Sequence, residues 1–199
     1  MSSASTSPAR AGNKNIARDI AFIAVFAALI WAFSFLKIPV GSLGVPITLQ
    51  TFAIGVTGFL LGPWRGFAAT LLYVALGLLG LPVFAGGTGG FTVLAGPTAG
   101  YIIAFPLFAL LCGIVAKRCL LKLSGVKLWL TLGLLGLVAS FITIHPLGIG
   151  GLVINADLAP ADAIKADMPF WPGDAIKNFA AAAVAVFVHK AFPRLLTDD

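Results

Sequence analysis

Glutamate is absent from this chain of 199 residues, and charged residues of every kind make up only 10% of it. Soluble domains carry about 25% charged residues, whereas 59% of this sequence is hydrophobic. This composition excludes an ordinary soluble domain and predicts one integral membrane domain. The net charge of +6 does not indicate a nucleic-acid partner, because the basic residues stand in short clusters between apolar runs, where they set membrane topology.

The motifs of common catalytic sites are also missing. The chain has no Gly-x-x-x-x-Gly-Lys-Ser/Thr loop for ATP phosphates, no Gly-x-Ser-x-Gly and no His-Glu-x-x-His. Two cysteines, Cys112 and Cys119, are too few for a disulfide framework or a zinc site. We therefore expect no enzyme activity, no metal and no cofactor in this chain, and any ATP hydrolysis would need separate subunits.

Six apolar segments are long enough to span a membrane, since about 20 residues cross the hydrocarbon core and fewer suffice where neighbours bury the ends. They are predicted at residues 17–36, 47–61, 64–81, 99–119, 127–145 and 174–192. The Gly-Pro turn at residues 62–66 favours two separate spans on either side of it. The expected fold class is an all-α membrane protein, a bundle of six transmembrane helices.

Basic residues predict how this bundle is oriented. With the N-terminus in the cytosol, ten of them fall on the cytosolic side, against Lys37 and Lys165 outside, with Lys177 at a helix start set aside. The positive-inside rule therefore places both termini in the cytosol. We expect a disordered cytosolic tail at residues 1–16, the bundle at 17–192 and a cytosolic tail at 193–199. The cytosolic ten are Arg10, Lys14, Arg18, Arg65, Lys117, Arg118, Lys122, Lys127, Lys190 and Arg194.

Three segments rich in glycine and proline fall on the predicted outer side, at residues 39–50, 81–100 and 146–173. Non-helical backbone near a membrane is tolerated only where protein or water covers it. The three segments therefore predict a covered pocket at the outer face. The third also carries Asp157, Asp162 and Asp167, expected outside, and follows His145, which we expect at the membrane interface.

Asp174 and Lys177 stand at the mouth of the last apolar segment, spaced so that a helix would place them on one face. Ionisable groups inside a bilayer are expensive and usually functional. They could form a structural ion pair, or they could hold a polar ligand between them. Asp174 also suits an N-cap, but a cation near a helix N-terminus opposes the helix dipole, so Lys177 should have a partner.

Other candidates come from the remaining outer segments. Gln50 is the only glutamine and could cap a helix end or bind a ligand through its amide. The run at residues 86–90 is either a flexible turn or bare backbone that a ligand approaches closely, with Thr88 adding a hydroxyl. Separately, small residues at helical spacing in the first span predict either close internal packing or a docking face for a membrane partner. They are Ala17, Ala21, Ala24, Ala28 and Ala32.

The order of several outer motifs resembles the BioY family, the biotin-specific substrate-binding subunits (S components) of energy-coupling-factor (ECF) transporters. The resemblance covers residues 17–190. The motifs are Pro46-Ile47-Thr48-Leu49-Gln50, Leu61-Gly62-Pro63, Gly80-Leu81-Pro82-Val83-Phe84-Ala85-Gly86-Gly87-Thr88-Gly89-Gly90, Gly96-Pro97-Thr98-Ala99-Gly100-Tyr101 and Pro172-Gly173-Asp174-x-x-Lys177. The resemblance implies a six-helix bundle with cytosolic termini, a biotin site near the outer face, and the cytoplasmic (inner) membrane of a prokaryote.

That resemblance implies roles for individual residues. Asp174, Lys177 and Gln50 would bind the polar groups of biotin, and Thr88 stands where some family members carry asparagine. The remaining substrate-binding candidates are Gly87, Gly89, Phe91, Tyr101, Phe170 and Trp171.

The resemblance also implies partners. The first span, through Ala24 and Ala28, would dock to a transmembrane coupling protein with two ATPase subunits, whose ATP cycle topples the bundle in the lipid and delivers biotin inside. The alternatives are an S component for a different vitamin, a small membrane enzyme that uses Asp174 and Lys177 as an acid–base pair, and a passive channel.

Overall fold

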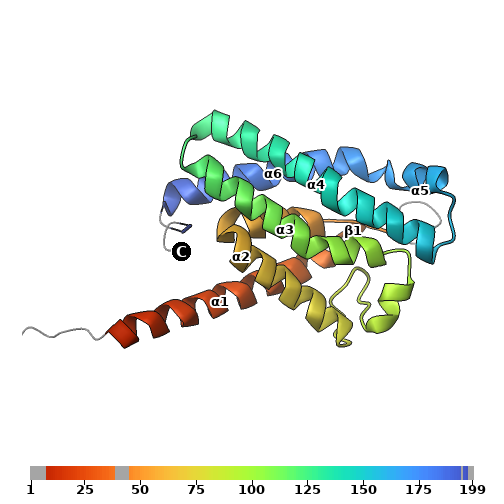
Figure 1. Ribbon diagram of the computed structural model, residues 1–199, viewed down its shortest axis with the longest axis horizontal. Coiled ribbons are helices and arrows are strands. Elements are labelled where there is room, and N and C mark those ends of the chain that lie inside the picture. Colours follow the sequence, from red (N-terminus) through yellow and green to blue (C-terminus); the bar gives the residue numbers. More distant parts are fainter. Residues whose placement is uncertain (1–7, 39–44, 194, 197–199) are drawn as a thin grey trace, which may run out of the picture.

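Figure 1 shows the computed structural model as a bundle of long helices, and the structure describes residues 8–38, 45–193 and 195–196. The helices are α1 (Pro8–Ser34), α2 (Gln50–Leu78), α3 (Ala99–Leu120), α4 (Gly125–Asn155), α5 (Pro160–Asp167) and α6 (Phe170–Ala191), with a 3₁₀ helix η1 (Phe91–Ala95). A short antiparallel ribbon of β1 (Lys37–Ile38) and β2 (Ile47–Thr48) joins α1 to α2. The predicted helical architecture is confirmed, and the ribbon is a feature that the apolar pattern did not predict. Part of the first predicted outer segment, residues 39–44, lies outside the described residues.

The predicted break between the second and third spans lies inside α2. Gly62 has φ 79° and ψ −175°, a non-helical conformation open to glycine, and Pro63 follows it. Gly58 and Gly66 would be about 12 Å apart along a continuous helix. Instead, a Cβ on Gly66 would lie 3.0 Å from the Cα of Gly58, so the two arms of α2 fold back on each other. With its arms counted separately, α2 contributes two of the six long helical segments, as predicted.

Small residues let α2 and α3 cross closely at this kink. A Cβ on Gly58 would lie 2.7 Å from the Cβ of Cys112, and one on Gly113 would overlap the backbone of Gly62 and Pro63. Such contacts through small residues are typical of membrane helix packing. The rest of the bundle assembles around this crossing, because α4 packs against α3 and α6, and α6 packs against α2.

Helix α1 lies at the edge of the bundle, where α2 is its one extensive contact among the described elements. It begins at Pro8, inside the segment for which the sequence predicts a tail, because a helix nucleated in the apolar segment propagates with one hydrogen bond per residue. Only 11% of its apolar window is buried. The whole predicted alanine stripe is exposed, so internal packing does not explain it; the stripe is Ala17, Ala21, Ala24, Ala28 and Ala32.

The predicted outer segment at residues 146–173 is mostly helical, which corrects the expected loop. Helix α4 continues from the predicted end at His145 through Pro146 to Asn155, and α5 follows. The proline removes one hydrogen bond without ending the helix, as neighbouring helices in membrane proteins allow. Helix α6 begins at Phe170, so Asp174 lies in its second turn and is not an N-cap.

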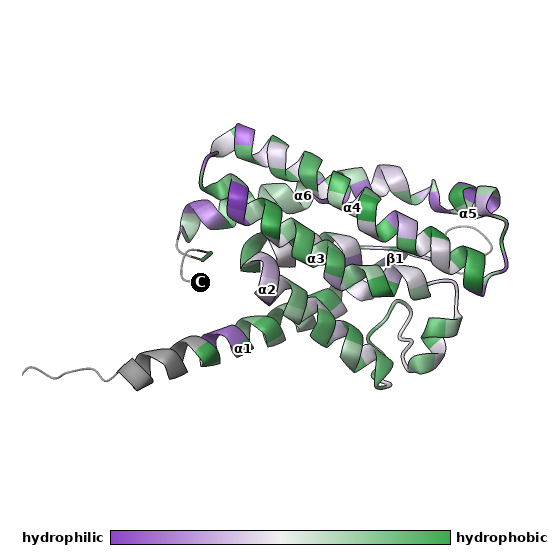
Figure 2. Ribbon diagram, viewed as in Figure 1, coloured by the Kyte–Doolittle hydropathy of each residue, from purple (hydrophilic) through white to green (hydrophobic). Residues whose placement is uncertain are grey.

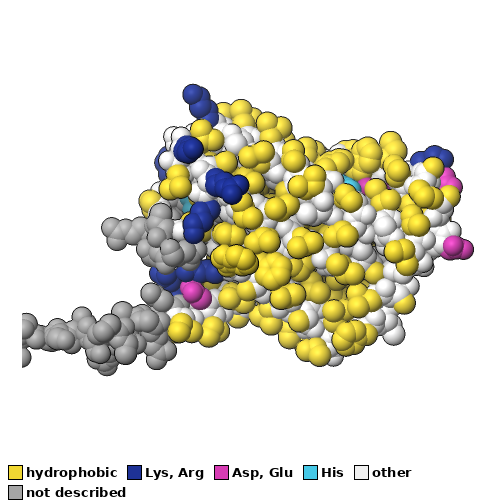
Figure 3. All heavy atoms as spheres, in the orientation of Figure 1, with side chains coloured by type: hydrophobic (Ala, Val, Ile, Leu, Met, Phe, Trp, Pro, Cys, Tyr) yellow, Lys and Arg dark blue, Asp and Glu magenta, His cyan; other side chains and the backbone are white. Residues whose placement is uncertain are grey.

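The surface of the bundle is apolar along its sides and charged at its ends. Figure 2 shows hydrophobic residues along the helices, and Figure 3 shows most of the visible Lys and Arg side chains gathered at the end where α1 begins and α6 ends. Within the described residues, α1, α2, α3 and α4 are long and apolar enough to cross a membrane. The basic cluster beside both chain ends agrees with a topology that places both termini on the same side.

Candidate functional site

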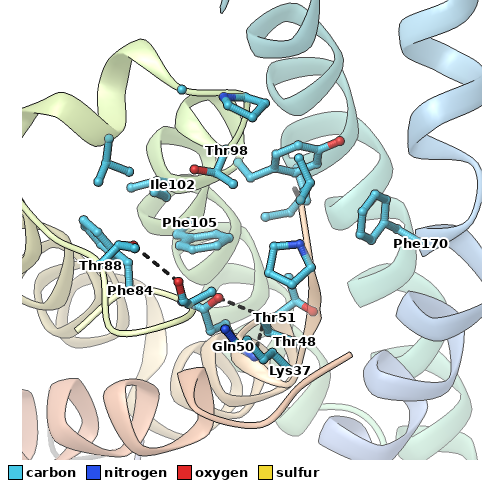
Figure 4. Close-up of a pocket in the computed structure, with 18 of the residues that line it drawn as sticks. Lys37, Thr48, Gln50, Thr51, Phe84, Thr88, Thr98, Ile102, Phe105 and Phe170 are labelled. Atoms are coloured by element: carbon cyan, nitrogen blue, oxygen red, sulfur yellow. Dashed lines mark hydrogen bonds between the residues drawn. The ribbon is translucent and has the colours of Figure 1, made fainter. Parts of the chain in front are cut away.

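A cavity of about 670 Å³ opens at the other end of the bundle (Figure 4). It lies between the β1–β2 ribbon, the start of α2, the loop before α3, and the first turns of α3 and α6. Its polar lining residues are Lys37, Thr48, Gln50, Thr51, Thr88, Thr98, Tyr101, Asp174 and Lys177. Its other lining residues are Val45, Pro46, Phe84, Ala85, Val93, Gly96, Pro97, Ile102, Phe105, Ile144 and Phe170. The predicted covered pocket between the outer segments is therefore present.

Asp174 and Lys177 form a buried ion pair in this cavity. The Lys177 Nζ lies 2.8 Å from the Asp174 Oδ1, and the two residues are 8% and 3% exposed. Thr51, which sequence reasoning missed, bridges the pair: its hydroxyl donates to Asp174 Oδ1 at 3.1 Å and accepts from Lys177 Nζ at 3.1 Å. Because both charged residues also line the cavity, a polar ligand can reach a preformed donor and acceptor set.

A second polar cluster, centred on Asp167, lies next to the Asp174–Lys177 pair. The carboxylate of Asp167, 0% exposed, accepts hydrogen bonds from Tyr101 Oη, His145 Nδ1 and Trp171 Nε1, each at 2.7 Å. His145 Nε2, a buried atom without a hydrogen-bond partner, faces Asp174 Oδ2 at 3.6 Å. The expectation that His145 lies at the membrane interface is therefore wrong, and so is the expectation that Asp167 lies in a loop, because α4 and α5 carry these side chains inward. The cluster ties α3, α4, α5 and α6 together around Asp174.

Gln50 lines the cavity, but its amide is already held by protein. Its Nε2 donates to Tyr73 Oη at 2.5 Å and its Oε1 accepts from the Thr48 hydroxyl at 2.8 Å. The Tyr73 hydroxyl in turn donates to the carbonyl oxygen of Val83. A satisfied buried network is rigid, so Gln50 fixes the loop before η1 against the start of α2.

The glycine-rich run contributes to the cavity through Thr88 alone. The hydroxyl of Thr88 lines it and donates to the carbonyl oxygen of Ala85 at 3.3 Å. Neither Gly87 nor Gly89 is a lining residue. Gly87 has φ 73°, as a tight turn requires, and a Cβ on Gly89 would overlap the carbonyl oxygen of Leu81. These two glycines serve the fold of the loop.

Some of the aromatic candidates line the cavity and others do not. Tyr101 and Phe170 line the cavity with ring centroids 5.9 Å apart. Trp171 points to Asp167 instead, and Phe91 is 67% exposed outside the lining. Phe84 and Phe105, which sequence reasoning missed, form apolar wall (Figure 4). The cavity thus combines one charged end with aromatic walls, and the described residues hold no cluster of three metal-ligating side chains.

Two of the missed residues left a trace in the sequence. Thr51 directly follows the singled-out Gln50, and Phe84 lies inside the glycine-rich motif. Lys37 was counted only as one of the rare outer cations. For Phe105 and Ile144, which look like any other apolar residues of a membrane helix, no sequence signal was available.

The comparisons with known proteins agree with this architecture. The profile of the BioY family matches residues 3–194. A biotin transporter BioY of Rhodobacter capsulatus is 41% identical over 189 residues, covering 90% of this chain and 97% of that protein. A biotin transporter BioY of Rhizobium etli is 34% identical over 180 residues, covering 89% and 96%.

Among solved structures, the crystal structure at 2.1 Å of the S-component for biotin from an ECF-type ABC transporter is similar, with a TM-score of 0.81. The sequences are 31% identical, and the match covers 89% of this chain and 94% of that one. These similarities, together with four apolar helices of membrane-spanning length, confirm an all-α, multi-pass membrane protein that is not an enzyme. The resemblance in the outer motifs is confirmed as well: the chain belongs to the BioY family.

Proposed function

We propose that this protein binds biotin with high affinity and serves in its uptake, as the substrate-specific S component of an ECF-type transporter. The observation that carries this proposal is the buried Asp174–Lys177 pair, bridged by Thr51, at one end of an otherwise mainly apolar cavity. The cavity volume of about 670 Å³ lies in the usual range for small-ligand sites, about 300–1,000 Å³.

The chemistry of biotin is complementary to this cavity. Its ureido head offers two N–H donors and one carbonyl acceptor, which match the carboxylate of Asp174 and the ammonium of Lys177. Its thiophane ring is apolar and suits the walls formed by Phe84, Phe105 and Phe170. Charge-assisted hydrogen bonds contribute about 1.5–3 kcal/mol each, so a few of them in a largely desolvated site support nanomolar affinity, about −12 kcal/mol.

Helix α1 supplies the proposed docking face for the transport partners. Ala24 and Ala28 are exposed on it, in a helix that is little covered by the rest of the chain. Small residues let another helix approach closely. We propose that this face binds an ECF transmembrane coupling protein that carries two cytosolic ATPases. The surrounding bilayer would be the cytoplasmic membrane of a prokaryote, with the basic end of the bundle in the cytosol.

The binding half of the proposal is tested with purified protein in detergent. Calorimetry should give tight biotin binding for the wild type and a loss of about 100-fold or more for Asp174→Asn and Lys177→Ala. The matched control is the Asp162–Lys165 pair, which has the same spacing but is exposed and outside the cavity. Wild-type affinity in both cavity variants, or binding of another vitamin in preference to biotin, would contradict the proposal.

The docking half is tested by adding bulk to α1. The double variant Ala24→Trp/Ala28→Trp should keep biotin binding and lose copurification with the coupling protein. Ala183→Trp, at an exposed alanine of α6, controls for added bulk elsewhere. Assembly of the full complex with both tryptophans present would show that α1 is not the docking face.

A further inference from the structure

One exposed lysine in the lining of the cavity has no role in the site described above. Lys37 is the first residue of β1 and lines the cavity. In the antiparallel ribbon its register partner is Thr48, and side chains at paired positions lie on the same face of a ribbon. Thr48 is itself a lining residue and bonds Gln50, so the ribbon directs Lys37 to the cavity rather than to the outside.

The glycine loop makes room for the ammonium of Lys37. A Cβ on Gly86 would lie 2.9 Å from Lys37 Nζ, and Gly86 also has φ 82°, which favours glycine. The Lys37 ammonium therefore lies directly against the bare backbone of Gly86. Figure 4 shows Lys37 close to Thr48 and Gln50.

The charges of the lining leave Lys37 without compensation. Lys37, Asp174 and Lys177 are the three charged lining residues, and Asp174 already pairs with Lys177 at 2.8 Å. In the part of the chain that the structure describes, no carboxylate forms a salt bridge with Lys37. The described lining thus carries a net charge of +1, and its uncompensated cation is on the exposed Lys37, whereas Asp174 and Lys177 are buried.

We infer that Lys37 binds the carboxylate at the end of the substrate's aliphatic tail, while the Asp174–Lys177 pair binds the polar head. This inference rests on the proposed biotin function, because biotin carries its ureido head and its carboxylate at opposite ends. A monoanionic ligand oriented in this way neutralises the lining. Lys37 then selects acids over neutral derivatives with the same head and ring.

The test compares biotin with biotinamide, whose tail ends in a neutral amide. Calorimetry is performed on the wild type, Lys37→Met, Lys37→Arg and the control Lys165→Met, which removes an exposed cation of α5 outside the lining. Lys37→Met should weaken biotin about tenfold and leave biotinamide within about twofold. Lys37→Arg should keep most of the preference for biotin, and Lys165→Met should change neither affinity.

The outcomes separate this inference from the function on which it rests. If the wild type binds biotin and Lys37→Met binds it equally well, or if both ligands lose affinity to the same extent, Lys37 does not bind the tail and the inference is overturned alone. If the wild type binds neither ligand, the proposed function fails and the inference fails with it. A loss confined to biotin supports both.

Discussion

Replacing Lys177 by methionine in the ligand-free protein tests whether the Asp174–Lys177 pair is a desolvated ion pair. Asp174 is 3% exposed and Lys177 is 8% exposed, and their charged atoms lie 2.8 Å apart. Methionine has a similar length and no charge, so the variant mainly removes the ammonium. The carboxylate of Asp174 then keeps the Thr51 hydroxyl as a donor and loses the one cation that lies within 3 Å of it among the described residues.

Breaking a buried pair from one side destabilises a protein by about 3–5 kcal/mol, because an uncompensated charge stays buried. For a domain of this size, 1 kcal/mol shifts Tm by about 2–4 °C, so Lys177→Met should lower Tm by about 10 °C. Replacing both charges, as Asp174→Asn/Lys177→Met, removes the uncompensated charge. The double variant should therefore regain most of that stability, with a coupling energy of about 3 kcal/mol.

Thermal unfolding followed by circular dichroism in one detergent measures all three variants, and calorimetry with biotin accompanies it. Stability and binding should separate, because the double variant regains Tm but should not regain biotin affinity. The exposed pair is the control: its side chains are 72% and 58% exposed, so Lys165→Met should change stability by less than about 1 kcal/mol. A wild-type Tm for Lys177→Met, or a double variant that is no more stable than Lys177→Met, would refute the reasoning from burial.

Three further predictions follow from contacts elsewhere. Thr51→Val keeps the side-chain shape and removes the hydroxyl that bridges the pair, so calorimetry should show biotin affinity about fivefold to tenfold weaker with little change in Tm. Gly58→Ala should destabilise the α2–α3 crossing by about 1–3 kcal/mol in thermal unfolding, whereas Gly150→Ala, in a helical position with open space, should be neutral or stabilising by up to about 1 kcal/mol. His145→Phe removes one of the three donors to the buried Asp167 carboxylate and should cost about 1–3 kcal/mol in the same assay; an unchanged Tm would show that the other two donors suffice.

Helix boundaries could be predicted where the sequence itself marks them. The fourth span was expected at residues 99–119 and α3 runs Ala99–Leu120, because an apolar run stands between a Gly-Pro turn and a basic cluster. The kink at Gly62 could also be predicted, because a Gly-Pro turn marks it in the sequence. The end of α4 was not, since Pro146 usually signals a helix end in water. In this bundle α4 continues through Pro146, so His145 lies in the core and not at the membrane interface.

The charged residues of the site could be predicted from the sequence, because burying a charge is costly. Its uncharged residues could not. Charges are rare in apolar segments, so Asp174 and Lys177 stood out by sequence alone. Thr51 did not, because a threonine in a helix usually bonds its own backbone and carries no signal of a long-range partner. Aromatic residues were chosen by position in the outer segments, and Trp171 and Phe91 proved to lie outside the lining, because helical phase and loop path decide which ring enters a cavity.

Under the proposed transport function, the close packing of the bundle below the cavity limits how biotin could reach the cytosol. Below the cavity, Phe59 and Cys112 are 0% exposed, and His189 joins α6 to α2 by a hydrogen bond of 2.9 Å to the carbonyl oxygen of Phe59. Near the basic end, Arg65 pairs with Asp19 at 2.9 Å and links α2 to α1. A path through the bundle would open these close-packed contacts, with a loss of dispersion and burial at each one. The sides of the bundle, by contrast, are apolar on the face that Figure 3 shows, so turning the whole bundle in the lipid breaks few internal contacts. Under the proposed function, rotation of the intact bundle, driven through the proposed partner on the exposed face of α1, would therefore be the delivery route with the smaller free-energy cost.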